Sequence, residues 1–384
     1  MRRRVLLAIT VYNGRSFVPA CLESAARIDQ EAADADVLVL DDASPEPGWS
    51  ADLEGLCQKL EIQYYCSPRN LGIVRNVNLG LLRAASAGYD FVIISNSDVI
   101  YPRQLLTNLL AVADSDPQVA SVTAWSNNVS VYSLPNAQPD EYLANQDVVD
   151  WISASLAGHF GTAAVDIPAG ISFCLLVRVS ALSQIGLMDP VFGRGYCEET
   201  DWSLRSLAAG FRLVLAPSAF VYHRGQGSTA EAGMISGGHT TVPANEAIID
   251  LRYPLFRSQV AAFLASDILP SLWRDGTARI TRDACKQWGY TVELTSLARL
   301  SRAAVTPHIV IHPSSRAPRI EALFRGFRAE VPDGGTDVAA AIRQFAGREP
   351  SHVRLLQPSA LGDVLLREFA DAHRSTFSSY PEKV

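Results

Sequence analysis

The 384-residue sequence lacks the features that mark membrane, secreted and nucleic-acid-binding proteins. No apolar run approaches the ~18–20 residues of a transmembrane helix, and the apolar stretch 5–10 is too short for the h-region of a signal peptide. The net charge of −7, with no Lys/Arg block beyond Arg2–Arg4, gives no electrostatic footprint for nucleic acid. We therefore expect a globular protein with no transmembrane segment and no nucleic-acid partner.

The six cysteines contain no CxxC pair and are spread over predicted strands and helices. Isolated cysteines in apolar contexts usually pack as small hydrophobic residues, so neither disulfides nor a structural zinc site is supported. The composition, 48% hydrophobic and 19% charged, is that of an ordinary globular protein with a large core. A reducing cytoplasm is the expected location, with peripheral attachment at the inner face of the membrane as an alternative.

The first third of the chain alternates between apolar strands and helices. Continuous apolar strands are expected at residues 5–9, 37–40, 62–66, 91–94 and 119–122. Uninterrupted apolar strands between helices indicate a parallel sheet covered on both faces. The sequence therefore predicts an α/β fold with a Rossmann-like, mostly parallel central sheet.

The composition of the sequence changes after about residue 240. Helices are expected within 244–272, near 320–327 and at 361–373, and a strand at 308–311. This predicts two domains, residues 1–240 and 241–384, the second a smaller C-terminal α/β or helical accessory domain in which we find no motif. We expect it to serve acceptor choice or self-association, with no catalytic role.

Polar residues follow three of the predicted strands, at the carboxyl ends where open α/β sheets bind their ligands. Three such clusters would meet in one crevice. As an alternative, the acids at 41 and 42 build a turn and cap the next helix. The three clusters consist of Thr10, Tyr12 and Asn13, of Asp41 and Asp42, and of Asn96 and Asp98.

Residues 69–72 form a Gly/Asn turn before a helix, and the spacing is not that of a dinucleotide-binding loop. Taken alone, the turn is structurally ordinary. In the context of the strand-end residues, Gly72 at a helix start permits close approach of a diphosphate or sugar, and Arg75 would offset its charge.

Asp98 and His223 are candidate metal ligands. A hard divalent cation is commonly held by one or two carboxylates plus substrate phosphates, and a neutral imidazole is a common metal ligand. His223 precedes the flexible segment 224–228. The alternatives are a helix-capping Asp and a buried strand histidine.

Three acids, Glu198, Glu199 and Asp201, open a predicted helix. Acids also favour helix N-termini for purely structural reasons. Asp201 can pair with Arg205 one turn along, and Glu198 lies on that same side. Glu199 points elsewhere and is the acid without an evident structural partner.

Taken together and in order, these segments resemble the inverting GT-A glycosyltransferases of family 2, and the bacterial rhamnosyltransferase-like members look closest. The resemblance covers about residues 4–228. It implies transfer of a sugar, with inversion, from a UDP or dTDP sugar to an acceptor hydroxyl. The segments that carry it are 10–13, 39–44, 69–72, 96–98, 170–173, 186–189, 198–201 and residue 223.

Residue by residue, the resemblance implies that Thr10, Tyr12 and Asp42 hold the nucleoside. Asp98 and His223 would bind Mg²⁺ or Mn²⁺, and Glu199 would be the catalytic base. Two positions depart from the family pattern, because Asn96 replaces the first acid of the DxD-type motif and Glu198-Glu199 replaces the usual Glu-Asp pair. Further donor-binding candidates are Asn13, Asn70, Gly72, Arg75 and Asn96.

The acceptor stays open between a saccharide, a lipid-linked saccharide, a peptide and a small metabolite, and a homo-oligomer through the C-terminal region is a further alternative. Two other functions share this sheet type: a nucleotide-sugar-binding scaffold without activity, and a sugar nucleotidyltransferase. The latter needs an early Gly-rich loop with Arg and Lys, which is absent after residues 5–9. The combination of Asp98, Glu199 and His223 favours an enzyme.

Overall fold

The structure, a computed structural model, describes residues 2–135, 143–225, 242–294, 305–313, 318–332, 337–355, 359–369 and 373–376. The chain divides into two units. The first comprises Met1–Ser133 and Ala144–Ile268, and the second comprises Leu134–Leu143 and Leu269–Val384.

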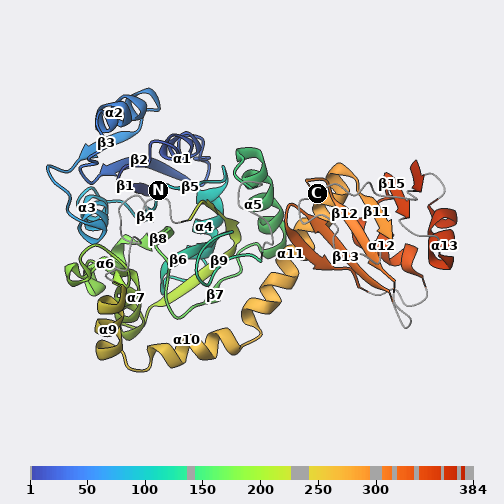
Figure 1. Ribbon diagram of the computed structural model, residues 1–384. Coiled ribbons are helices and arrows are strands. Elements are labelled where there is room, and N and C mark those ends of the chain that lie inside the picture. The colour runs from blue at the N-terminus through green and yellow to red at the C-terminus, as the bar shows by residue number, and fades with distance from the viewer. Residues whose placement is uncertain are drawn as a thin grey trace. The chain divides into compact units, whose positions relative to one another are not determined.

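An eight-stranded sheet forms the centre of the first unit, with strand order β3-β2-β1-β4-β8-β6-β9-β7 (Figure 1). β8 is antiparallel to both of its neighbours, and β7 is antiparallel to β9, whereas the other adjacent strands run parallel. The predicted mostly parallel central sheet is therefore confirmed. Its strands are β1 (Arg3–Val11), β2 (Ala33–Asp41), β3 (Gln63–Cys66), β4 (Phe91–Ser95), β6 (Val119–Trp125), β7 (Val165–Asp166), β8 (Cys174–Arg178) and β9 (Arg212–Phe220).

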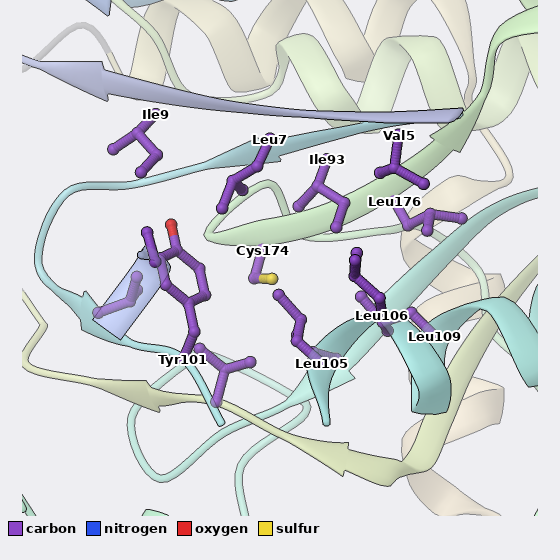
Figure 2. Packing of buried hydrophobic residues seen from close by; sticks show 14 of the residues in the cluster. Val5, Leu7, Ile9, Ile93, Tyr101, Leu105, Leu106, Leu109, Cys174 and Leu176 are labelled. Carbon is purple, nitrogen blue, oxygen red and sulfur yellow. The ribbon is translucent and has the colours of Figure 1, made fainter. Parts of the chain in front are cut away.

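Helices cover both faces of this sheet, as the continuous apolar strands require. On one face, alternate side chains of β1 such as Leu7 point with Ile93 of β4 toward Leu105 and Leu109 of α4 (Figure 2). The other face of β1 packs against α3. The helices that follow the first strands are α1 (Val18–Ala25), α2 (Trp49–Lys59), α3 (Ile73–Ser86) and α4 (Leu105–Ala113).

A separate two-stranded ribbon lies at the end of β4. β5 (Val99–Ile100) pairs antiparallel with β10 (Tyr222–His223), so that His223 lies opposite Val99. The remaining helices of the first unit are α5 (Gln146–Phe160), α6 (Val179–Ile185), the short η2 (Pro190–Phe192), α7 (Glu198–Ala208), α9 (Val242–Arg252) and α10 (Phe256–Ala265).

The first unit extends beyond the division that we expected at residue 240. α9 and α10 both belong to it, and the division falls after Ile268. The physical reason is that Asn245 and Arg252 of α9 donate hydrogen bonds to the segment before and within α7. The helix expected over 244–272 is interrupted at Pro254, because a proline disfavours helical geometry in the residue before it.

A six-stranded sheet forms the second unit, with order β14-β13-β12-β11-β15-β16. One face of the sheet packs against α11, α12 and α13 in a single apolar cluster, so this unit is α/β. Its elements are α11 (Ile268–Trp288), β11 (Thr291–Leu294), β12 (His308–His312), β13 (Arg319–Phe324), β14 (Phe327–Glu330), α12 (Val338–Ala346), β15 (His352–Leu355), α13 (Ala360–Glu368) and β16 (His373–Thr376).

The helix predicted near 320–327 is wrong, because this segment is the hairpin of β13 and β14. The two residues at its turn, Arg325 and Gly326, both have positive φ, 46° and 86°. Positive φ at both central positions is the geometry of the tight turns that join antiparallel strands. None of the helices in the described part of the chain has the length and hydrophobicity needed to cross a bilayer.

Helix α3 approaches β1 closely at Gly80, and this contact allows a direct test of the packing. A Cβ on Gly80 would lie 2.8 Å from the Cβ of Ala8 and 3.4 Å from Leu40 Cδ1. We expect Gly80→Ala to push the helix off the sheet and to lower the free energy of unfolding by about 1–3 kcal/mol, as overpacking does, measured by urea denaturation. Gly55→Ala in α2 is the matched control, because nothing lies within 4 Å of its added Cβ; it should be neutral or stabilise by up to about 1 kcal/mol. Equal effects of the two substitutions would contradict the packing of α3 on β1.

Candidate active site

A cavity of about 720 Å³ opens at the carboxyl ends of β1, β2 and β4 in the first unit. Its volume lies within the range of small-molecule and cofactor sites, roughly 300–1,000 Å³. It brings together most of the residues that the sequence singled out. The predicted site residues in its lining are Thr10, Tyr12, Asp42, Asn70, Gly72, Asn96, Asp98, Glu199 and His223.

Asn13 and Arg75 are absent from this lining. The backbone N–H of Asn13 donates to Ser44 Oγ at 2.8 Å, and its carbonyl accepts from Trp49 Nε1 at 3.1 Å. Asn13 therefore ties two turns together beside the cavity. Arg75 is exposed on α3. Their roles as donor ligands stay predictions.

The β5–β10 ribbon places His223 beside Asp98. His223 Nε2 lies 3.2 Å from Asp98 Oδ1 and 3.4 Å from the amide nitrogen of Asn96. The other ring nitrogen, Nδ1, is 2.6 Å from the carbonyl oxygen of Asn128. A carbonyl accepts only, so Nδ1 carries the proton and Nε2 of the neutral ring is an acceptor. An acceptor nitrogen and a buried carboxylate oxygen that face one another are suited to a divalent cation.

Nowhere among the described residues, this site included, do three His, Cys, Asp or Glu side chains lie close enough together to hold a metal ion. Asp98 and His223 therefore offer two candidate ligands. This fits a hard cation that completes its shell with substrate phosphates and water rather than one held by an all-protein cage.

Glu198 and Glu199, the first two residues of α7, both line the cavity. Burial raises the pKa of the Glu198 carboxyl well above its ordinary value, and the negative charge of Glu199 raises this pKa further. Burial also raises the pKa of Glu199, against hydrogen bonds from its own backbone N–H and from Glu198. Both carboxyl groups therefore have raised pKa values, and a hydrogen bond between them lets the pair share one proton.

This hydrogen bond corrects the expectation that Glu199 has no structural partner, because both side chains of the first turn reach into the cavity. The expected pair of Asp201 with Arg205 is present, with Arg205 Nε 2.9 Å from Asp201 Oδ2. Asp201 is fully buried outside the cavity lining. The structure therefore separates the three acids into a cavity pair and a structural ion pair.

The two acids at the end of β2, Asp41 and Asp42, also differ. Asp42 lies in the cavity and accepts the N–H groups of Leu71 and Gly72 at 2.7 and 2.9 Å. Burial raises the pKa of Asp42. Asp42 therefore holds the 70–72 turn against the end of β2. Asp41 has the structural role that we named as an alternative, because it is buried and accepts hydrogen bonds from Ser44, Ser50 and Tyr64.

Comparisons with known proteins identify the architecture around this cavity. Residues 7–186 match the model of the family described as Glycosyl transferase family 2. The chain is 27% identical over 241 residues to an undecaprenyl-phosphate mannosyltransferase of Micrococcus luteus, a match that covers 61% of this chain and 90% of the relative.

Residues 7–186 therefore carry a family 2 glycosyltransferase domain. Among solved structures, it is similar to GalNAc-T7 with UDP, GalNAc and Mn²⁺, with a TM-score of 0.50 and 13% identity over 66% of this chain. The chain spans about half of that protein, 49% of its length. The mannosyltransferase PcManGT of Pyrobaculum calidifontis, in complex with GDP-Man and Mn²⁺, matches with a TM-score of 0.44 and 18% identity over 71% of this chain and 78% of that one. The expected GT-A fold and family are confirmed.

Sequence reasoning missed several residues that shape the glycosyltransferase cavity. Asn76 is buried in α3, donates to Leu40 O at 2.9 Å and leaves its Oδ1 without a hydrogen-bond partner in the described part of the chain. An amide on the apolar face of an amphipathic helix was the signal that could have marked it. Tyr196 and, from α10, Phe256 and Val260 also line the cavity, and no local pattern distinguishes them from ordinary loop and helix residues.

Proposed function

We propose that the glycosyltransferase domain moves a sugar from a nucleoside diphosphate sugar to an acceptor oxygen with inversion at the anomeric carbon, assisted by Mg²⁺ or Mn²⁺. The observation that supports it most is one cavity lined by two different polar pairs. Asp98 with His223 is suited to a cation, and Glu198 with Glu199 is suited to proton transfer.

In this mechanism, Glu199 accepts the proton of the acceptor oxygen while that oxygen attacks the anomeric carbon. The bond from this carbon to the diphosphate breaks, and the nucleoside diphosphate leaves with the electron pair. A divalent ion held by Asp98 and His223 would neutralise the negative charge on that leaving group. A positioned base contributes typically 10²–10⁴-fold, and Glu198 keeps Glu199 oriented by its hydrogen bond.

For the donor side, we retain Thr10, Tyr12 and Asp42 as the groups around the nucleoside, with UDP or dTDP sugars first among the candidates. Asn70, Gly72 and Asn96 line the same cavity and are suited to hold the sugar and the diphosphate. Gly72 has φ of 81°, and a Cβ there would lie 2.9 Å from Gly193 O, so a side chain would crowd the cavity wall.

For the acceptor, we propose a molecule that carries an apolar group next to its reacting oxygen. Apolar side chains from three segments line the cavity together with Glu199, among them Val129, Ile171 and Phe256. The relative from Micrococcus luteus is named for undecaprenyl phosphate, which carries a long apolar chain, and a saccharide hydroxyl on such a lipid would supply the proton that Glu199 accepts. A lipid-linked acceptor would also agree with peripheral membrane attachment, which stays a prediction.

Turnover with a panel of donors and acceptors tests the function directly. We expect Mn²⁺-dependent release of nucleoside diphosphate from a UDP, dTDP or GDP sugar to be accelerated at least tenfold by a polyprenyl-linked saccharide in detergent micelles, compared with free monosaccharides. Acceleration by a free saccharide alone would contradict the apolar acceptor. Binding of donors without turnover would indicate a scaffold, and release of pyrophosphate from a nucleoside triphosphate with a sugar phosphate would indicate a nucleotidyltransferase.

The metal assignment predicts that nucleoside diphosphate binding depends on Asp98 and His223. In calorimetry of UDP or dTDP with Mn²⁺, addition of EDTA, Asp98→Ala or His223→Ala should each weaken binding at least tenfold, because the diphosphate loses its cation. Asp166→Asn, which removes an exposed acid on β7, is the matched control and should bind normally. Unchanged affinity in EDTA and in Asp98→Ala would overturn the metal site.

The acidic pair predicts a defined pH dependence of turnover. Because burial raises the pKa of Glu199, the activity should fall with decreasing pH at values above the ordinary glutamate pKa of about 4.3. Glu199→Gln should lower kcat by about 10²-fold or more with donor affinity nearly intact, since the amide cannot accept a proton.

Two substitutions of Glu198 separate the effect of its hydrogen bond to Glu199 from the effect of its charge. Glu198→Gln keeps a hydrogen-bond donor toward Glu199, so the activity should fall with decreasing pH at the same pH as in the wild type. Glu198→Met has a similar length without a donor, so the pKa of Glu199 should rise and the fall in activity should move to higher pH. An active Glu199→Gln beside an inactive, folded Glu198→Gln would reverse the assignment of the base.

A further inference from the structure

The loop that leads into the Glu198–Glu199 pair has an unfavourable backbone conformation. Tyr196 and Cys197 both have positive φ, 69° and 75°, and Gly195 before them has φ of 114°. Left-handed geometry is unfavourable for a residue with a side chain, because its Cβ approaches the following carbonyl oxygen. Such a conformation persists only where surrounding contacts fix it. Because Glu198 follows directly, these angles set the direction in which α7 starts and its first two carboxyl groups point.

One buried amide on α9 contacts the carbonyl groups of this loop. The side-chain nitrogen of Asn245, a residue only 5% exposed, lies 3.0 Å from Phe192 O, 2.8 Å from Gly195 O and 2.9 Å from Tyr196 O. An amide NH₂ carries two hydrogens, so at least one is shared between two of these carbonyls. A single side chain therefore satisfies three carbonyls on both sides of Arg194.

The C-terminal end of α9 also contacts residues on both sides of this loop, Asp189 before it and Asp201 after it. Arg252 Nη1 lies 2.9 Å from Asp189 Oδ2 and 2.8 Å from Asp201 Oδ1, and the hydroxyl of Tyr253 donates to Asp201 at 2.9 Å. Asp189 in turn accepts from the N–H of Val191 at 2.9 Å. α9 is thus bonded to residues before the loop, in the loop and within α7, and Figure 1 shows α9 next to α7.

We propose that Asn245 is a positioning residue for the catalytic base, a role that rests on the proposed function. By donating to the three carbonyls it holds the left-handed loop, and the loop fixes Glu199 in the cavity. Asn245 is not in the cavity lining and touches no reacting atom. α9 therefore belongs to the catalytic apparatus, although it lies beyond the resemblance that the sequence showed.

The test compares three variants of the full chain. Asn245→Leu has a similar volume without donors, Asn245→Gln keeps the donors on a longer side chain, and Asp250→Asn is the matched control. Asp250 is an exposed residue of the same helix that pairs with Arg257, and among the described residues it makes no hydrogen bond or ion pair with the loop. An exposed pair of this kind contributes little to stability.

Hydrogen exchange followed by mass spectrometry measures how stably the loop is held, and it needs no assay of activity. Asn245→Leu should accelerate exchange at least tenfold in peptides that cover residues 193–200 and leave peptides of β1 and β4 unchanged. Asn245→Gln should fall between this variant and the wild type, and Asp250→Asn should match the wild type. Uniform acceleration across the first unit, or none in the loop, would overturn the proposal.

Kinetics then connect the loop with the base. Asn245→Leu should lower kcat at least tenfold, with the donor KM and the Kd of UDP or dTDP with Mn²⁺ within about threefold of the wild type, and Asn245→Gln should recover part of kcat. A normal kcat, or a loss of nucleotide affinity that matches the loss of kcat, would overturn the positioning role. If the wild type turns over no sugar nucleotide, the proposed function fails together with that role, and the exchange data still decide whether Asn245 holds the loop.

Discussion

The pairing of two very short strands, β5 with β10, is the constraint on which the rest of the site depends. It brings a residue that follows β4 next to one that follows β9, so that Asp98 and His223 face each other at 3.2 Å. The ribbon is fixed on its other side by Asn127, which exchanges two hydrogen bonds with the backbone of His223, 2.8 and 2.9 Å long. A carboxylate and an imidazole held in this way are oriented before any ligand arrives, which lowers the cost of binding one.

The acidic pair at the start of α7 differs from the Asp98–His223 pair, because burying two carboxyl groups destabilises the folded protein. Two carboxyl groups are placed in a poorly solvated cavity, and one oxygen of each has no hydrogen-bond partner among the described residues. Burial of this kind raises carboxyl pKa values and opposes ionisation. For a general base the same effect is useful, since a pKa closer to neutrality improves proton transfer. The left-handed residues at 195–197 and the contacts of Asn245 fit this view, because strain at functional sites needs support from outside them.

Much of the fold follows from the sequence through simple physics. Continuous apolar strands such as Val5–Ile9 predicted the parallel part of the sheet, and polar residues at their ends predicted where the cavity lies. The failures have physical causes too. The segment 320–327 carries apolar residues at spacings that suit a helix, but the turn at Arg325 and Gly326 makes it a hairpin.

The candidate site was harder to predict where it depends on contacts distant in sequence. Glu199 was singled out as the candidate base and lines the cavity, but its hydrogen bond with Glu198 depends on how the helix start faces the cavity, which spacing alone does not give. Asn245 and Phe256 follow the family-like region, and nothing in their local sequence ties them to the site. Their place is set by tertiary contacts, so the division after Ile268 rather than near residue 240 was not visible in composition.

The most direct measurement of the central claim is a crystal structure of the full chain with UDP or dTDP and Mn²⁺, with data collected at the manganese absorption edge. The proposed function predicts one anomalous peak bonded to an oxygen of Asp98, to His223 Nε2 and to diphosphate oxygens, with the nucleoside near Thr10 and Asp42 and the Glu199 carboxylate open to the same cavity. A manganese ion bound to other residues, or a nucleotide seated outside this cavity, would contradict it.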